Sequence, residues 1–350
     1  MHFSYHNPKR HFPVGKLPLN FLDELLRRYA PRDDHVIVGP GIGADAAVIE
    51  TGGPRYLIAK TDPITFTAEH MGWYAVHINA NDIAAMGGRP RWFLATLLLP
   101  ENKTTSADVE KIFAEISTSC ASLGITLVGG HTEITYDLNR PLIVGQMLGE
   151  VEKDKLVRSG GSRPGDAIVL TKGIAVEGTA IIAGEWEAEV TRAFGTGMVG
   201  RCKNFIYEPG ISVVKEALLA TERFRVHAMH DPTEGGVATA LHELGRAADV
   251  GILAHGEAIK IFPETQRLCD HFQIDPLGLI ASGALLVTLE PAEAEVLIST
   301  LAREGIAAAR IGEVVPKSQG VKVETSAGLK DLRLYEQDEL TKIAAAVDRS

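Results

Sequence analysis

Four aspartates lie beside small residues where short apolar segments end, and their type and placement suit metal and phosphate chemistry: Asp45, Asp62, Asp82 and Asp231. Their surroundings read GADAA from Gly43, KTDP from Lys60, NANDIAAMGG from Asn79 and HDPTEGG from His230. Magnesium prefers oxygen ligands and is commonly held by a few carboxylates together with phosphate oxygens. If these carboxylates converge in the fold, we expect them to form a magnesium–nucleotide site.

Asn79 and Asp82 are three residues apart on a predicted helix over 72–86 and therefore share one face of it. A solvated helix face is the alternative interpretation. Ile78 and Ile83 place these polar side chains among apolar neighbours, where a polar pair needs partners. This context favours a functional role for the pair.

Two glycine-rich segments could bring backbone amides close to a phosphate. Gly39–Gly43 is neither a P-loop nor a dinucleotide fingerprint, and on its own a plain turn is the favoured interpretation. Gly129, Gly130 and His131 follow a short apolar run that ends at Val128. For this second segment a structural turn and a ligand loop are equally open.

Other residues favour structural roles. His131, His227 and His230 lack the i, i+4 spacing of a helical zinc pair, so we expect satisfied structural histidines. Thr233 is placed to cap a helix that begins at Glu234. Cys120 falls on the apolar side of a predicted helix and is expected in the core.

The composition indicates a globular protein with an acidic surface. The chain has 350 residues, 45% of them hydrophobic, and a formal net charge of −10. Such a charge disfavours nucleic acid and anionic lipid as partners. The three dispersed cysteines and the polar segment up to Pro13, which contains His2, His6 and His11, lead us to expect a cytoplasmic protein without a signal peptide or a membrane span.

The apolar periodicity predicts two domains, 1–155 and 163–350, with the boundary in the polar stretch 150–164. We expect an α+β fold with mixed or antiparallel sheets, because strands and helices alternate too irregularly for a doubly wound pattern. The expected strands are 46–49, 56–60, 92–99, 125–128, 142–148, 166–171 and 284–289. The expected helices are 17–29, 72–86, 106–123 (starting at a cap on Ser106), 175–183, 211–220, 234–247 and 292–304.

The ordered motifs resemble the AIR synthase superfamily over nearly the whole chain. They are GADAAV from Gly43, Thr61-Asp62, NANDIAAMGGRP from Asn79, GGHTE from Gly129, RPGD from Arg163 and HDPTEGG from His230. Members include aminoimidazole ribonucleotide synthase, the hydrogenase maturation factor HypE, thiamine-monophosphate kinase and selenophosphate synthetase. The HypE-like proteins are the most similar in the Asp231-Pro-Thr and Gly312-Glu-Val regions.

This resemblance implies a homodimer whose N-terminal sheets close a shared barrel, with a C-terminal α/β sandwich beside it and ATP near the interface. Carried over by motif, the metal ligands are Asp45, Asp82 and Asp231, and the cofactor-binding residues are Asp62, Asn79, Gly129, Gly130 and His131, the glycine segment being supplied by the partner subunit. Asp82 and Asp231 are the predicted catalytic residues, and Lys16 is expected to be solvated. The shared chemistry is attack of a substrate nucleophile on the γ-phosphate of ATP in the presence of Mg²⁺.

Departures from the relatives limit the choice of substrate. HypE-like proteins dehydrate a carbamoyl group on a C-terminal cysteine, and this sequence has no cysteine after Cys269. No cysteine precedes Cys120, which argues against selenide, and the paired aspartates of thiamine-monophosphate kinase become Ala44-Asp45. We therefore predict an ATP- and Mg²⁺-dependent enzyme that phosphorylates or activates a small substrate or amide oxygen. The alternative is a nucleotide-binding partner protein of a maturation pathway with reduced catalysis.

Overall fold

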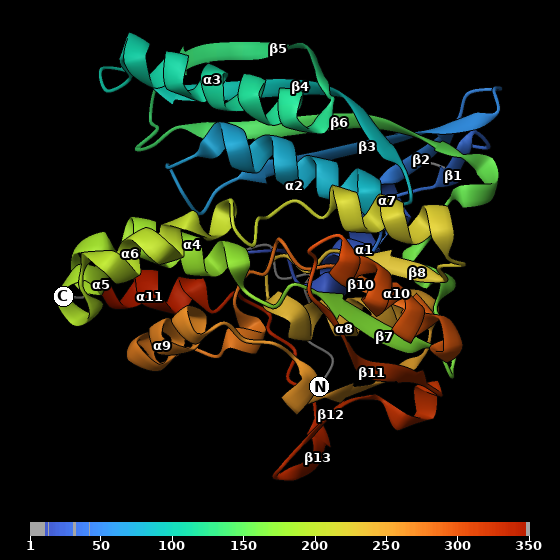
Figure 1. The fold of residues 1–350 in the computed structure, drawn as a ribbon. Helices are drawn as coiled ribbons and strands as arrows, with labels where there is room; N and C mark the ends of the chain where they lie inside the picture. The colour runs from blue at the N-terminus through green and yellow to red at the C-terminus, as the bar shows by residue number, and fades with distance from the viewer. Residues whose placement is uncertain (1–10, 13, 31–32, 42, 348–350) are drawn as a thin grey trace.

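The computed structural model describes residues 11–12, 14–30, 33–41 and 43–347 (Figure 1). Most of the polar N-terminal segment, including His2, His6 and Pro13, lies outside these residues. The helices are α1 (Leu19–Tyr29), α2 (Met71–Ala85), α3 (Ser106–Leu123), α4 (Val176–Glu185), α5 (Glu187–Phe194), α6 (Thr196–Lys203), α7 (Val214–Arg223), α8 (Gly236–Ala248), α9 (Pro263–Phe272), α10 (Pro291–Arg303) and α11 (Leu340–Val347). The strands are β1 (Val36–Val38), β2 (Ala47–Glu50), β3 (Arg55–Ile64), β4 (Arg89–Pro100), β5 (Thr126–Thr135), β6 (Leu142–Glu152), β7 (Ala167–Thr171), β8 (Ala228–His230), β9 (Gly251–His255), β10 (Leu286–Leu289), β11 (Ala308–Val315), β12 (Val321–Thr325) and β13 (Gly328–Asp331).

The N-terminal sheet has the strand order β1-β2-β3-β6-β4-β5, with β4 and β5 parallel and the other pairs antiparallel. Helices α2 and α3 cover one face of it, at the top of Figure 1. On the opposite face, Leu94, Leu98 and Leu148 are only partly buried. This sheet therefore has one closed face and one open apolar face.

The C-terminal sheet has the order β13-β12-β9-β11-β7-β10-β8 and is also mixed, because β12 runs parallel to β9. Its central strands β7 and β10 are buried along their whole length, since residues on both faces pack into apolar clusters. One face packs against α8 and the other against α10. The predicted α+β class with two mixed sheets is confirmed, whereas the shared barrel stays a prediction.

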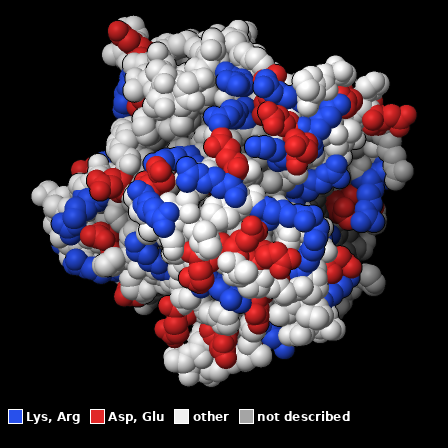
Figure 2. All heavy atoms as spheres, turned by 45° about the vertical axis from the view of Figure 1, so that its right-hand side comes forward, with Lys and Arg blue, Asp and Glu red and all other residues white. Residues whose placement is uncertain are grey.

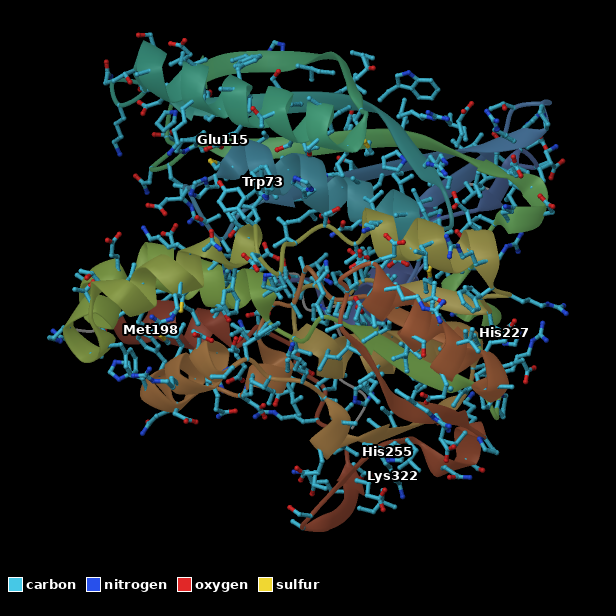
Figure 3. The ribbon with its side chains drawn as sticks, viewed as in Figure 1. Trp73, Glu115, Met198, His227, His255 and Lys322 are labelled. Atoms are coloured by element: carbon cyan, nitrogen blue, oxygen red, sulfur yellow. The ribbon has the colours of Figure 1, made fainter. Side chains whose placement is uncertain are left out.

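Helix α2 lies between the N-terminal sheet and the C-terminal half (Figure 1). Its sequence is apolar or small on every side, which is the pattern of a helix buried all round. Trp73 points from α2 toward the C-terminal half (Figure 3), where its ring lies 4.8 Å from that of Tyr207. Polar residues on this helix are consequently held deep inside the molecule.

The local start signals of two helices were predicted incorrectly. Helix α3 begins with a capping box on Thr105, whose side chain pairs reciprocally with Asp108, instead of a cap on Ser106. Helix α8 begins at Gly236, and Thr233 does not cap it. Gly235 and Gly236 both adopt positive φ, and a Cβ on Gly236 would lie 2.4 Å from the carbonyl oxygen of Leu277.

The segment from Gly129 to His131 is neither a turn nor a loop, because β5 continues through it to Thr135. Gly130 pairs with Ala95 of β4, and a Cβ on Gly130 would lie 2.0 Å from the Ala95 carbonyl oxygen. Glycine is required there by the close approach of two strands. None of the helices in the described residues is long and apolar enough to cross a bilayer.

Candidate active site between the two sheets

A cavity of about 350 Å³ opens where the N-terminal sheet, α2 and the C-terminal half meet. Strand β3, helix α2, the segment before β2 and the segment between β8 and α8 each contribute one of the predicted aspartates to its wall. Asp45, Asp62, Asp82 and Asp231 therefore converge, although 186 positions of sequence separate the first from the last. Convergence, which the sequence left as an assumption, is present in the fold.

Lys60 links two of these carboxylates. Its Nζ lies 3.0 Å from Asp82 Oδ1 and 3.7 Å from Asp62 Oδ2. Lys60 and Asp62 are two residues apart on β3, so both side chains emerge on the same face of the strand. The two aspartates hold the pKa of this lysine above its usual value despite its burial. Lys60 is thus a permanent positive charge at the centre of the site.

Asp45 belongs to a buried charged network with His230 and Glu243. His230 Nδ1 lies 2.6 Å from Asp45 Oδ1, and His230 Nε2 lies 3.1 Å from Glu243 Oε2. The second Asp45 oxygen accepts a hydrogen bond from Ser159 at 3.2 Å. Burial alone would lower the pKa of His230, but the flanking carboxylates raise it well above its ordinary value. A proton on each ring nitrogen would let His230 donate to both carboxylates.

Asp82 and Asp231 have carboxylate oxygens without partners. Asp82 Oδ2 and both oxygens of Asp231 are buried and lack a hydrogen-bond donor in the described part of the chain. Burial raises the pKa of Asp82 well above its usual range, and burial together with Asp45 raises the pKa of Asp231 to about 7. Buried carboxylate oxygens without a hydrogen-bond partner are unfavourable unless a cation or a hydrogen-bond donor approaches them. Carboxylate oxygens suit Mg²⁺, and those of Asp82 and Asp231 are free to hold it. Ligand atoms of Asp231, Asp45 and His230 lie within 4.8 Å of one another.

Glycine positions bring these elements together. Gly43 adopts a φ of +75°, and a Cβ there would lie 3.1 Å from the Glu243 carbonyl oxygen of α8. The segment carrying Asp45 can therefore press against the helix that carries Glu243. The Gly39–Gly43 segment, for which we favoured a plain turn, contributes Gly41 and Gly43 to the cavity wall.

The remaining predicted residues lie elsewhere. Asn79 is fully buried behind the wall and donates to the carbonyl oxygens of Asp62, at 3.3 Å, and Ala75, at 2.9 Å, so it positions β3. Gly129, Gly130 and His131 are exposed on β5, three strand positions away from β3 and roughly 14 Å from it across the sheet. Their contact with a cofactor stays a prediction that needs a second subunit.

The structure shows where the histidines expected to be structural, and the lysine expected to be solvated, lie. His227, at the right of Figure 3, is a satisfied buried histidine whose Nδ1 lies 2.9 Å from Asp166. His131 is exposed and pairs with Glu133 at 3.3 Å. Lys16 is half exposed but lines the cavity, with Nζ 3.3 Å from Thr233 Oγ1. Thr233 therefore faces the site.

Sequence reasoning missed Lys60, Glu243 and Glu177, all of which line the cavity. Lys60 could have been found from the period of two along β3, which places it beside Asp62. Glu243 interrupts the buried face of α8 at a position where an apolar residue is expected. Glu177 carries no local signal, because the segment that faces it comes from residues more than 100 positions away.

We expect Lys60→Ala to make the stability of the protein depend on Mg²⁺. Removing one partner of a buried ion pair costs roughly 3–5 kcal/mol, and less where the remaining carboxyl takes up a proton. The thermal midpoint should fall without Mg²⁺ and recover when MgCl₂ is added, because a cation then replaces the lost ammonium. Lys317→Ala, which removes an exposed pair with Asp249, is the control. Equal midpoints for Lys60→Ala and the wild type in both buffers would contradict this role.

The chain belongs to the AIR synthase related protein family. The model of the family's N-terminal domain matches residues 43–151, and that of its C-terminal domain matches residues 163–324. The sequence resemblance to this superfamily is thereby confirmed over most of the chain.

Relatives with assigned names are similar over most of their length. A protein of Methanocaldococcus jannaschii named for hydrogenase expression and formation is 27% identical over 303 residues, which cover 83% of this chain and 86% of the relative. The carbamoyl dehydratase HypE of Cupriavidus necator is 27% identical over 282 residues, 78% of this chain and 77% of the relative. A crystal structure of the hydrogenase maturation protein HypE in complex with ATP superposes with a TM-score of 0.70 at 25% identity and covers 94% of this chain and 98% of that one. An ATP-dependent enzyme of this superfamily is therefore the class to which the chain belongs.

Proposed function

We propose that this protein binds ATP with Mg²⁺ in the cavity and transfers the γ-phosphoryl group to a small acceptor or an amide oxygen. The observation that carries the proposal is the set of buried, unpartnered oxygens of Asp82 and Asp231 beside the ammonium group of Lys60. A triphosphate alone would be repelled by so many carboxylates. A magnesium–triphosphate complex supplies the missing positive charge and its own oxygen ligands together.

Different residues of the cavity would bind the metal ion and the phosphate groups. Asp82 and Asp231 hold the cation, and Asp62 and Lys60 lie beside it on β3, where Lys60 can turn from Asp82 toward a phosphate oxygen. The acceptor atom attacks the γ-phosphorus, the bond to the β–γ bridging oxygen breaks, and ADP leaves. Magnesium would stabilise the charge that develops on the phosphate oxygens. The His230–Asp45–Glu243 network fixes the segment that bears Asp231.

Calorimetric titration of ATP, with and without Mg²⁺, tests the proposal. The wild type should bind ATP in a Mg²⁺-dependent manner, and Asp82→Asn should lose this binding because a metal ligand becomes a neutral amide. Asp249→Asn, at an exposed site in the C-terminal half, is the matched control and should bind like the wild type. Absence of binding by the wild type would reject the proposed function.

A partner protein with reduced catalysis is the second candidate. Ala44 lines the cavity beside Asp45, and both oxygens of Asp45 are engaged by His230 and Ser159. Fewer carboxylate oxygens are therefore free to bind a metal ion than the four aspartates together contain. In this case ATP binds as described, but no small acceptor stimulates its consumption and a stable protein complex forms instead.

We infer that the protein forms a homodimer through β5. Leu127, Val128 and Ile134 on this edge strand are exposed, and the adjoining sheet face is apolar and open. Figure 2 shows a broad uncharged area at the top of the molecule, where the N-terminal sheet lies, while acidic and basic side chains are interspersed below it. Burying this surface would bring Gly129–His131 toward the partner's cavity.

Ile134→Glu should therefore convert a dimer into a monomer. Ile134 is 56% exposed in the single chain, so the substitution costs little there, whereas a buried interfacial carboxylate is strongly unfavourable. Light scattering coupled to size exclusion measures the mass. Val296→Glu, at a 55% exposed position on α10, is the control and should stay dimeric. A wild-type monomer, or a dimeric Ile134→Glu variant, would refute the interface.

A further inference from the structure

The cavity has a partly exposed outer end and a buried inner end, and carboxyl groups line both of them. The outer end is lined by Lys16, the Gly41 and Gly43 backbone and helix α1. The inner end is lined by Ile78, Ile181 and Ile280 together with two polar side chains, Glu177 and Ser282. The four aspartates line the same cavity. The two reactants of a phosphoryl transfer have to meet beside the metal ligands, so the two ends are the candidate places for them.

The polar groups of the inner end are buried and incompletely satisfied. Glu177 is 3% exposed and Ser282 is 1% exposed. Glu177 Oε2 and Ser282 Oγ have no hydrogen-bond partner in the described part of the chain. Burial raises the pKa of Glu177 to about 8, and the nearby Ser282 hydroxyl acts against this rise. A buried polar group without a partner destabilises the folded state unless a ligand pairs with it.

The backbone holds this end rigidly. Glu177 N donates to Ser282 O at 3.3 Å and Gly178 N donates to Ile280 O at 3.1 Å, which ties the first turn of α4 to residues 280–282. A Cβ on Gly178 would lie 2.5 Å from Leu279 Cγ, so this close packing requires glycine. The N-cap residue Ala175 has a φ of +56°, an unfavourable conformation for alanine that the surrounding packing maintains. Side chains on such a frame are preorganised for one kind of ligand.

We propose that the inner end is the acceptor subsite and that Glu177 and Ser282 select an acceptor with an uncharged amide or an amine group and against an anionic one. This inference rests on the proposed function, since it identifies the second reactant of the same site. A carboxyl group accepts hydrogen bonds from N–H groups, and its protonated form also donates to an amide oxygen. A phosphate or carboxylate group would meet Glu177 and the four aspartates with no described Lys or Arg lining that end.

The nucleotide is assigned to the outer end by the same charges. Lys16 is a cation at the outer end, although Glu243 lies 4.0 Å from its Nζ, whereas no described Lys or Arg accompanies Glu177 at the inner end, so the outer end suits a polyphosphate better. The amino group of adenine is nevertheless also an N–H donor. A test must therefore separate acceptor binding from nucleotide binding.

The experiment uses four probes of equal ring size: benzamide, benzylamine, benzoate and phenyl phosphate. Ligand-observed NMR measures their binding to the wild-type protein in the presence of Mg²⁺ and a non-hydrolysable ATP analogue, and calorimetry measures ATP affinity separately. We expect benzamide and benzylamine to bind and the two anions to be rejected. Glu177→Leu should weaken the two bound probes by about tenfold or more, the loss expected for one buried hydrogen bond. Glu177→Gln should retain benzamide, because a neutral amide still offers a donor and an acceptor.

Glu185→Gln is the matched control, because Glu185 lies at the exposed end of the same helix and outside the cavity. Equal binding of benzoate or phenyl phosphate by the wild type overturns the proposal, as does failure of all four probes while ATP binds normally. Loss of ATP affinity in Glu177→Leu with unchanged probe binding would place adenine at the inner end and also overturn it. Failure of the wild type to bind ATP is a different result, which rejects the proposed function itself.

Discussion

Asp231→Asn is expected to abolish Mg²⁺-dependent ATP consumption while leaving the thermal midpoint unchanged or higher. Both oxygens of this side chain are buried without partners, so the wild-type protein carries an uncompensated carboxyl whose pKa is raised to about 7. Asparagine removes the free-energy cost of burying this carboxyl group, but its single side-chain oxygen is a weaker metal ligand. Loss of a metal ligand typically removes binding and turnover together, whereas the folded state gains from the neutral side chain.

The two readouts make this prediction specific. Turnover is followed by phosphate release, and unfolding by thermal denaturation without metal. A variant that is inactive because it is misfolded would show a lower midpoint, which this account does not allow. Turnover equal to that of the wild type would remove Asp231 from the metal site. Asp249→Asn, on the surface, should change neither quantity.

Elements with a clear periodicity were predicted well. The helices expected over 72–86 and 106–123 agree with α2 and α3 within one residue, because each has a continuous apolar pattern and a clear end. The helix α5 was missed, because its eight residues mix charged side chains with few large apolar ones. Strands β12 and β13 were also missed, because both are short, β13 is exposed along its length, and β12 depends on pairing with the distant strand β9.

The site was predicted as a set of residue types but not as a network. Motif positions identified the four aspartates that line the cavity. His230 was assigned a structural role, but its contacts with Asp45 and Glu243 were not predicted, because these two partners come from separate elements of the fold. The local sequence identifies a residue when the backbone conformation of its own segment requires that residue type, as it does for Gly43 with its positive φ. It does not mark Glu177, whose chemistry depends on which distant segment faces it. The proposed contact of Gly129–His131 with the cavity of a partner subunit likewise depends on an interface that the sequence of one chain does not encode locally.

Glu177→Gln should stabilise the protein by an amount that grows with pH. In the folded protein, burial raises the pKa of Glu177 from 4.5 to about 8. The folded state then holds its proton where the unfolded state has released it. The wild type therefore loses stability as pH rises from the unfolded pKa through the folded pKa, and loses no more above that. Glutamine does not titrate, so the difference between variant and wild type should be small at acid pH and reach, at most, about 5 kcal/mol in alkaline solution.

Denaturant unfolding at a series of pH values measures this difference directly, and other titrating groups, such as Asp338 with its raised pKa, largely cancel between the two proteins. Glu185→Gln, at the exposed end of α4, is the control for the same Glu-to-Gln change outside the cavity. A flat difference for Glu177→Gln would mean that water or a neighbouring group already satisfies the carboxyl in the folded state. The inner end of the cavity would then lack the unpaired group that selects an acceptor, whereas a rising difference shows that this group is present before any ligand arrives.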